Sequence, residues 1–216
     1  MGTIDNLPLD GRVKGIIFDY GGTLDSRGDH WSHIISDAWR AAGLDVSPED
    51  FKKAYIIGER ALAVEGTVGR TDNFFDVMRK KVRAELGQFN LDHDNDLIEK
   101  IARYCYDYAR GCIADVAPVL HALSGRYPLA VISNFYGNIE TVLSDFGIRD
   151  CFRAVIDSAL VGVRKPDPAI FRLGVEALGL RPEEVLVVGD SLDKDIIPAQ
   201  TLGCPTFHVK GRGFMV

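Results

Sequence analysis

Residues 15–25 of the chain read GIIFDYGGTLD. A short apolar run stops at an acid, Asp19, and two glycines, Gly21 and Gly22, follow almost at once. This order predicts a buried strand that carries Asp19 to the end of a sheet, followed by a tight turn. On this stretch alone, a carboxylate that caps a helix or lies in a solvated loop is an equally good interpretation, because such sequences are common in α/β proteins.

The composition is that of a globular protein of moderate size. A chain of 216 residues fits one α/β domain, or a core domain with a modest insertion. Its net charge of −6 argues against a nucleic-acid-binding surface. The most basic run, residues 79–83, lies on a helical pattern and is expected to be a solvated face.

Targeting and redox signals are sparse. No apolar run approaches the ~20 residues of a membrane span, and residues 1–14 show no apolar signal region. The four cysteines have no CxxC pairing, and Cys105 and Cys112 are spaced to share one helix face in the core. We therefore expect a cytoplasmic protein with reduced thiols and neither membrane nor nucleic-acid partners; its oligomeric state is left open.

The pattern after the first strand is helical. Periodic apolar positions predict four amphipathic helices, at residues 30–42, 48–64, 71–86 and 94–110. The second has a clear start, since Ser47 can cap it and Pro48 suits its first turn. Four such helices with short links indicate an all-helical unit inserted between two strands.

From Asp115 onward the pattern alternates between helix and strand. One helix is expected from Asp115 to about Gly125, and others at residues 138–146, 168–178 and 196–202. Apolar strands are expected at residues 129–132, 154–156, 185–188 and 206–209. Apolar strands separated by helices predict a parallel sheet that is covered on both faces.

The predicted fold class is therefore α/β. A three-layer, Rossmann-like parallel-sheet core is expected from residues 1–26 and 115–216. An all-helical subdomain, residues 27–114, is expected as an insertion into it.

Polar side chains stand at the expected strand ends and before one helix: Asp19, Ser133, Asn134, Asp190 and Lys165. The carboxyl ends of parallel strands meet at one edge of a sheet, so these groups should lie together. Asp19 and Asp190 offer the hard oxygen ligands that Mg²⁺ prefers. The Ser133 hydroxyl could donate a hydrogen bond to a phosphoryl oxygen, and the Lys165 ammonium could pair with one. Asp195 could orient Asp190, Lys165 or a metal-bound water without binding the metal itself. The set favours a site for a metal and a phosphate, and with it a functional role for Asp19.

These motifs resemble those of the haloacid dehalogenase-like hydrolase superfamily, whose members are mostly magnesium-dependent phosphatases. The resemblance covers the whole chain, and the helical insertion falls where that family places a cap. Four segments carry it: residues 18–24 (FDYGGTL), 131–134 (VISN), 164–168 (RKPDP) and 188–195 (VGDSLDKD).

The resemblance implies a nucleophile and a metal site. Asp19 matches the family's nucleophilic aspartate and would also ligate Mg²⁺. The backbone carbonyl of Gly21 and the carboxylate of Asp190 would complete the protein's share of the ligands. Asp195 would be the acidic companion of Asp190.

It also implies how the substrate is held. Ser133, Asn134 and Gly22 would surround the transferring phosphoryl group, and Lys165 would neutralise charge on the nucleophile and the phosphate. The expected activity is hydrolysis of a small phosphorylated metabolite through an aspartyl-phosphate. Mg²⁺ and Lys165 would offset anionic repulsion, and the cap would exclude bulk water.

One position departs from the family pattern. Most phosphatases of the family carry a second aspartate two residues after the nucleophile, as general acid and base, and this chain has Gly21 there. The substrate could have a good leaving group, or Asp25 or His30 could serve instead. As a third possibility, the protein binds metal or phosphate and turns over slowly or not at all. The competing interpretation of Asp25 is a turn or hinge residue, and that of His30 is a residue at the start of the first helix of the cap.

A third function is 2-haloacid dehalogenase activity, which needs no metal in this family. Asp190 and Asp195 would repel a carboxylate substrate unless a cation lay between them, which favours magnesium and phosphate. Candidates for substrate contacts outside the motifs, with no spacing to rank them, are Arg60, Arg70, Trp31 and Tyr136.

Overall fold

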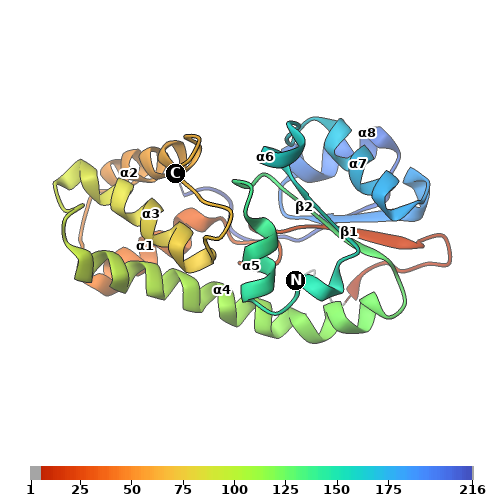
Figure 1. Ribbon diagram of the computed structural model, residues 1–216, viewed down its shortest axis with the longest axis horizontal. Coiled ribbons are helices and arrows are strands. Elements are labelled where there is room, and N and C mark those ends of the chain that lie inside the picture. Colours follow the sequence, from red (N-terminus) through yellow and green to blue (C-terminus); the bar gives the residue numbers. More distant parts are fainter. Residues whose placement is uncertain (1–5, 216) are drawn as a thin grey trace.

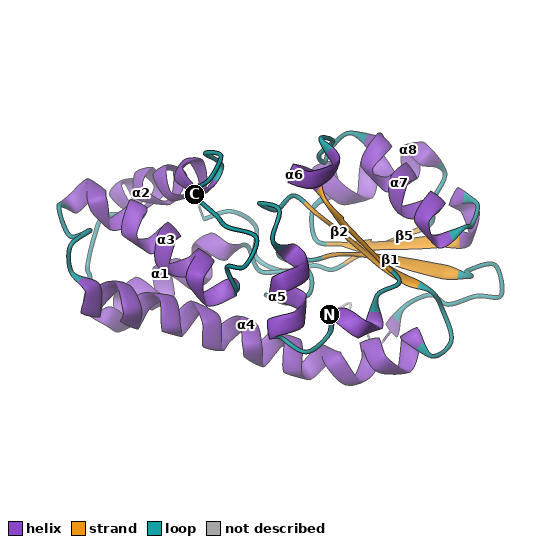
Figure 2. Ribbon diagram, viewed as in Figure 1, coloured by secondary structure: helices purple, strands orange, loops and turns teal. Residues whose placement is uncertain are grey.

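The computed structural model describes residues 6–215. It has a five-stranded parallel sheet with the order β3-β2-β1-β4-β5 (Figure 2). The strands are β1 (Gly15–Asp19), β2 (Leu129–Ser133), β3 (Ala154–Asp157), β4 (Val185–Gly189) and β5 (Thr206–His208). Because β1 is central, it delivers Asp19 to the middle of the sheet's carboxyl edge. The predicted α/β fold, a parallel sheet with a helical insertion between its first two strands in sequence, is confirmed.

Helices cover both faces of the sheet (Figure 1). α7 (Pro168–Leu178) and α8 (Ile197–Leu202) pack on one face, and α5 (Ile139–Asp145) and the second half of α4 (Asn95–Ser124) lie on the other. α7 packs so close to the sheet that only glycine fits at position 174: a Cβ there would lie 2.7 Å from Ile132 Cδ1 of β2. The remaining short elements are α6 (Ser158–Val161), a π-helical turn (Leu192–Ile196) and 3₁₀ turns at Gly87–Phe89, Arg149–Cys151 and Pro182–Glu184.

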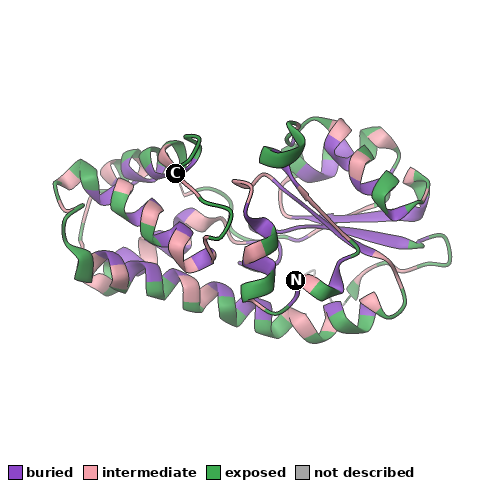
Figure 3. Ribbon diagram, in the orientation of Figure 1, coloured by how far each residue is buried: buried purple, intermediate pink, exposed green. Residues whose placement is uncertain are grey.

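The insertion forms a helical cap beside the sheet (Figure 1). It consists of α1 (Trp31–Ala42), α2 (Pro48–Leu62), α3 (Phe74–Leu86) and the first half of α4. Local chemistry fixes the helix starts: Ser47 accepts a hydrogen bond from Asp50 N at 3.1 Å, and Asn73 caps α3 reciprocally with Asp76. Figure 3 shows that the buried faces of these helices turn toward one another, as amphipathic helices require.

α4 contradicts the expectation of one helix that ends near Arg110 and a second that begins at Asp115. It runs without interruption through this point, with Pro118 inside it. The apolar stripe continues in phase across the proline, through Ala109, Ile113, Leu120 and Leu123. Burial of that stripe outweighs the hydrogen bond that Pro118 cannot donate. The proposed division of the chain between residues 114 and 115 falls inside this helix and stays a prediction.

The basic run at residues 79–83 is only partly a solvated face. Lys81 is 2% exposed, and its ammonium is paired with Glu59 and Glu85 inside the cap. The prediction was wrong for Lys81 because α3 turns this position toward α2. Cys105 and Cys112 are buried as expected, and all four cysteines are free. Within residues 6–215, no helix has both the length and the apolar character for crossing a membrane.

Candidate active site

Asp19 lies at the carboxyl end of the central strand and is 4% exposed. One carboxylate oxygen is ion-paired with the Lys165 ammonium, and the other accepts a hydrogen bond from Thr23 Oγ1 at 2.8 Å. Thr23 belongs to the turn that follows β1, so the turn and the lysine together fix the orientation of the carboxylate.

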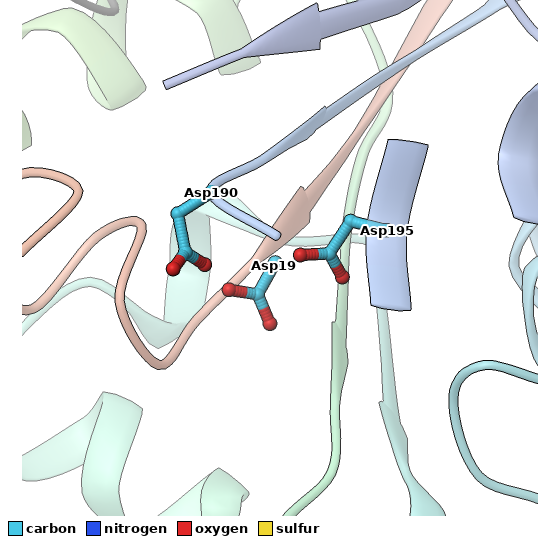
Figure 4. Close-up of side chains that lie close together, drawn as sticks. All are labelled: Asp19, Asp190 and Asp195. Carbon is cyan, nitrogen blue, oxygen red and sulfur yellow. The ribbon is translucent and has the colours of Figure 1, made fainter. Parts of the chain in front are cut away.

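Three carboxylates converge at this point: Asp19, Asp190 and Asp195 (Figure 4). One oxygen from each lies within 4.8 Å of the others. Burial, together with repulsion from the neighbouring acids, raises the pKa of Asp19 to about 8 and that of Asp190 to about 6. A compact set of carboxylate oxygens with raised pKa values is the donor chemistry that suits a divalent cation, so these residues fit Mg²⁺.

Gly22 makes room for one of these carboxylates. Its φ is +95°, and a Cβ at this position would lie 2.5 Å from Asp190 Oδ2. A side chain here would be strained and would displace Asp190. The glycine of the turn is thus required by the geometry of the acidic cluster.

Lys165 is the cation of the site. Its Nζ is ion-paired with Asp19 and lies 2.7 Å from Asp195 Oδ1, with the side chain 4% exposed. Burial alone would lower the pKa of Lys165, but the two carboxylates outweigh it and raise the pKa above its usual range. The lysine therefore remains charged beside Asp19.

Ser133 is the last residue of β2 and Asn134 follows it at the same edge, and both line the cavity in front of Asp19. The amide of Asn134 is engaged with the backbone of Lys165: it donates to the carbonyl at 2.9 Å and accepts from the N–H at 2.8 Å. Asn134 thereby positions Lys165, a contact that motif spacing does not reveal. The predicted phosphate contacts of Ser133, Asn134 and Gly22 stay predictions.

Gly21 lies in the cavity lining, and the two residues considered as its substitutes are both engaged elsewhere. Asp25 accepts hydrogen bonds from Gly22 N at 2.7 Å and from Trp31 Nε1 at 2.9 Å. Burial raises its pKa to about 7. His30 caps α1 by accepting from Ser32 N at 3.1 Å, and burial lowers its pKa to about 4. Asp25 ties the turn to the cap, and His30 is neutral near pH 7.

A cavity of about 750 Å³ lies between core and cap, in the size range of small-molecule sites. Trp31 and Tyr136 line it, whereas Arg60 and Arg70 are not part of its lining within residues 6–215. Sequence reasoning missed the cap residues Glu59 and Lys81. It also missed residues 210–214, which follow β5 and return to the cap, where His30 N donates to Arg212 O at 2.8 Å.

Comparisons with known proteins agree with this geometry. Residues 13–203 match the haloacid dehalogenase-like hydrolase family. The glyceraldehyde 3-phosphate phosphatase of Methanopyrus kandleri is 44% identical over 206 residues, which cover 92% of this chain and 84% of that protein.

Two solved structures show the same fold. A dehalogenase with an intermediate complex superposes with a TM-score of 0.64 at 19% identity, covering 95% of this chain and 88% of that one. The HAD-hydrolase YfnB from Bacillus subtilis, bound to magnesium, superposes with a TM-score of 0.55 at 21% identity, covering 90% and 87%. The family match over most of the chain, together with the four motifs at one sheet edge, shows that this protein belongs to the haloacid dehalogenase-like hydrolases.

Proposed function

We propose that the protein is a magnesium-dependent phosphatase of small phosphorylated metabolites, with Asp19 as nucleophile. The observation that carries this proposal is the position of the Asp19 carboxylate, which is bound by Lys165 and lies beside Asp190 in the lining of the cavity. The relative with 44% identity is a glyceraldehyde 3-phosphate phosphatase, which makes this triose phosphate the first substrate to assay.

The chain's own residues account for the nucleophile and for the neutralisation of charge in the reaction. An Asp19 oxygen forms a bond to phosphorus as the ester P–O bond breaks, and the leaving oxygen takes the electron pair and then a proton from water. Water next attacks the phosphorus of the aspartyl-phosphate, which restores the carboxylate and releases inorganic phosphate. Lys165 would offset the repulsion between the anionic nucleophile and the anionic substrate, and Ser133 would donate to a phosphoryl oxygen.

Asp19, Asp190 and the carbonyl of Gly21 would hold the metal, and Asp195 would orient Lys165 beside it. Bound Mg²⁺ supplies positive charge to the phosphoryl oxygens. The basic test is turnover of glyceraldehyde 3-phosphate and of acetyl phosphate, with Mg²⁺ and with a chelator. Activity that survives complete chelation would contradict the metal's role.

Magnesium affinity is expected to rise with pH between about 6 and 8. In the metal-free protein the pKa of Asp19 is raised to about 8 and that of Asp190 to about 6. The folded cluster therefore holds protons that an unfolded chain loses above about pH 4. Mg²⁺ must displace these protons, so its dissociation constant should fall as the pH rises.

Calorimetric titration at pH 6, 7 and 8, in buffers of different ionisation heat, measures both the affinity and the protons released. Asp193→Asn changes an exposed acid of the same loop and should keep the wild-type profile. A dissociation constant that does not vary with pH would contradict the proton competition.

The glycine at position 21 predicts a selective gain of function. A Cβ at Gly21 meets nothing within 4 Å, so Gly21→Asp should be accommodated. The new carboxyl would protonate a leaving alkoxide, and turnover of an alkyl phosphate should rise by up to about 100-fold. Acetyl phosphate needs little protonation of its leaving group and should change much less.

Gly11→Asp adds the same charge at an open, exposed position and serves as the control. If Gly21→Asp changed the turnover of alkyl and acyl phosphates equally, the absence of a general acid would not be what limits the rate. The competing hypothesis, a binding protein on this fold, is favoured by Gly21 alone. It predicts binding of Mg²⁺ and phosphate without turnover of any substrate in the panel.

A further inference from the structure

The cap side of the cavity is mostly apolar. Its wall combines aliphatic and aromatic side chains with two ionised ones, Glu59 from α2 and Lys81 from α3. The apolar and aromatic residues of this wall include Trp31, Ile35, Tyr55, Leu62, Phe74, Val77 and Met78. A few polar groups in an apolar wall are the usual means by which a pocket recognises one end of a ligand.

The ammonium of Lys81 is already fully engaged. It is ion-paired with Glu59, lies 3.4 Å from Glu85 Oε1, and stands over the Tyr55 ring at 4.1 Å from its centroid. The Lys81 side chain is 2% exposed. This cation is therefore not free to bind an anion in the cavity, and its role is to hold Glu59.

Glu59 is the group that the cap offers to a ligand. Its side chain is 46% exposed, and it lines the cavity. Burial would raise the pKa of Glu59, but the Lys81 ammonium and the Tyr55 hydroxyl outweigh it and hold the pKa below its ordinary value. Glu59 is thus an ionised acceptor with lone pairs to spare beyond those used by Lys81 and Tyr55.

Glu85 lies behind the Glu59–Lys81 pair, and helix α2 has space for it. It is fully buried behind Lys81, and within the described residues neither of its oxygens makes a hydrogen bond of normal geometry. A Cβ at Gly58 would lie 2.6 Å from Glu85 Cγ, so α2 has a glycine where this acid needs space. Such a buried cluster contributes little to stability.

The other cations of the cavity lie outside the cap. Lys194, in the turn after β4, and Lys210, after β5, are exposed and line the cavity from the core's side. Arg212 is bound to Asp29, with its Nη2 2.6 Å from a carboxylate oxygen. Arg212 is therefore engaged in the same way as Lys81, whereas Lys194 and Lys210 are available for the phosphate end of a substrate, which leaves Glu59 for the other end.

We propose that Glu59, held by Lys81, recognises the end of the substrate remote from the phosphate and selects a hydroxyl donor there over a carboxylate. This inference rests on the proposed phosphatase function and narrows it to phosphates whose far end is a hydroxyl or a hydrated aldehyde. A hydroxyl donates to the Glu59 carboxylate, whereas a second carboxylate would face like charge at close range.

Two three-carbon phosphates test the selection, because sn-glycerol 3-phosphate and 3-phosphoglycerate differ at C1, a hydroxymethyl group in one and a carboxylate in the other. Binding of each is measured by calorimetry with Mg²⁺ in an Asp19→Asn background, so that turnover does not enter. The parent should bind glycerol 3-phosphate at least about 30-fold more tightly. Glu59→Gln should reduce this ratio by about tenfold, and Glu59→Lys should invert it.

The remaining variants separate positioning from simple loss of structure. Lys81→Met should reduce the binding ratio, and Lys81→Arg should restore most of it, because only the latter can hold Glu59. Glu49→Gln neutralises an acid of the same helix whose side chain is 77% exposed, and it should leave the ratio unchanged.

A ratio within about twofold of the parent in both Glu59 variants would overturn this inference. Failure of the wild-type enzyme to hydrolyse any phosphate would instead overturn the proposed function, because the binding ratio does not depend on turnover.

Discussion

Asp19→Asn is expected to lower kcat by about 10⁴-fold or more. An amide is a poor nucleophile, so no aspartyl-phosphate can form, and the acidic cluster also loses one of its charges. The asparagine can keep the local structure, since its oxygen can accept from Lys165 and its amide can donate to the Thr23 hydroxyl. The measurement is the rate of phosphate release from acetyl phosphate with saturating Mg²⁺, together with mass spectrometry of rapidly quenched enzyme for a phosphorylated Asp19.

Asp37→Asn is the matched control for this variant. Asp37 is on α1, 40% exposed and paired with Arg40, and its loss should change kcat by less than about twofold. Circular dichroism and the unfolding midpoint of Asp19→Asn should show a folded protein. If Asp19→Asn retained more than a tenth of wild-type turnover, Asp19 would not be the nucleophile.

The sheet and its reactive edge could be predicted because their signals are local. Each strand is an apolar run that ends in a polar residue, and parallel strands bring those ends together. Asp19 and Asp190 were expected to meet on this ground, and the structure places their carboxylates in one cluster. Lys165 was expected at the same edge although it precedes a helix and does not end a strand, and in the structure its backbone is bound there by the amide of Asn134.

The cap cluster could not be predicted because its signals are not local. On the sequence, Lys81 is one of several basic residues on a helix, and an acid four residues later is also typical of a solvent-exposed helix face. Its burial depends on how α3 packs against α2, where Glu59 and Gly58 stand. The break expected at Asp115 failed for a similar reason. A start signal on the sequence was outweighed by a buried stripe that continues through Pro118.

Lys165→Met is expected to lower the free energy of unfolding by about 3–5 kcal/mol at pH 7 in a chelator. Methionine can follow the path of the lysine stem, so the main change is the loss of the ammonium. Asp19 and Asp195 would then face each other as buried carboxyls without a cation between them. Urea unfolding followed by circular dichroism measures the loss.

The loss should shrink on acidification, and this sets it apart from a packing defect. Without the ammonium, burial beside Asp195 must raise the pKa of Asp19 further above its unfolded value, so the folded variant binds a proton that its unfolded chain has released. Stability of the variant relative to wild type should therefore recover as the pH falls toward about 4. Removal of one acid in Lys165→Met/Asp195→Asn should recover much of it at pH 7.

Lys14→Met tests whether any lysine ion pair would give the same result. Lys14 Nζ lies 2.6 Å from Glu184 Oε1, but its side chain is 58% exposed, and its loss should cost less than about 1 kcal/mol. The explanation is that Lys165 relieves repulsion between Asp19 and Asp195. It would be contradicted if Lys165→Met were no more destabilising than Lys14→Met. It would also be contradicted if the loss of stability in Lys165→Met were the same from pH 4 to pH 8. A large loss that acid reverses would instead mean that the fold tolerates this acidic cluster only with a cation in it. That is the same electrostatic condition under which an anionic Asp19 can approach an anionic phosphate.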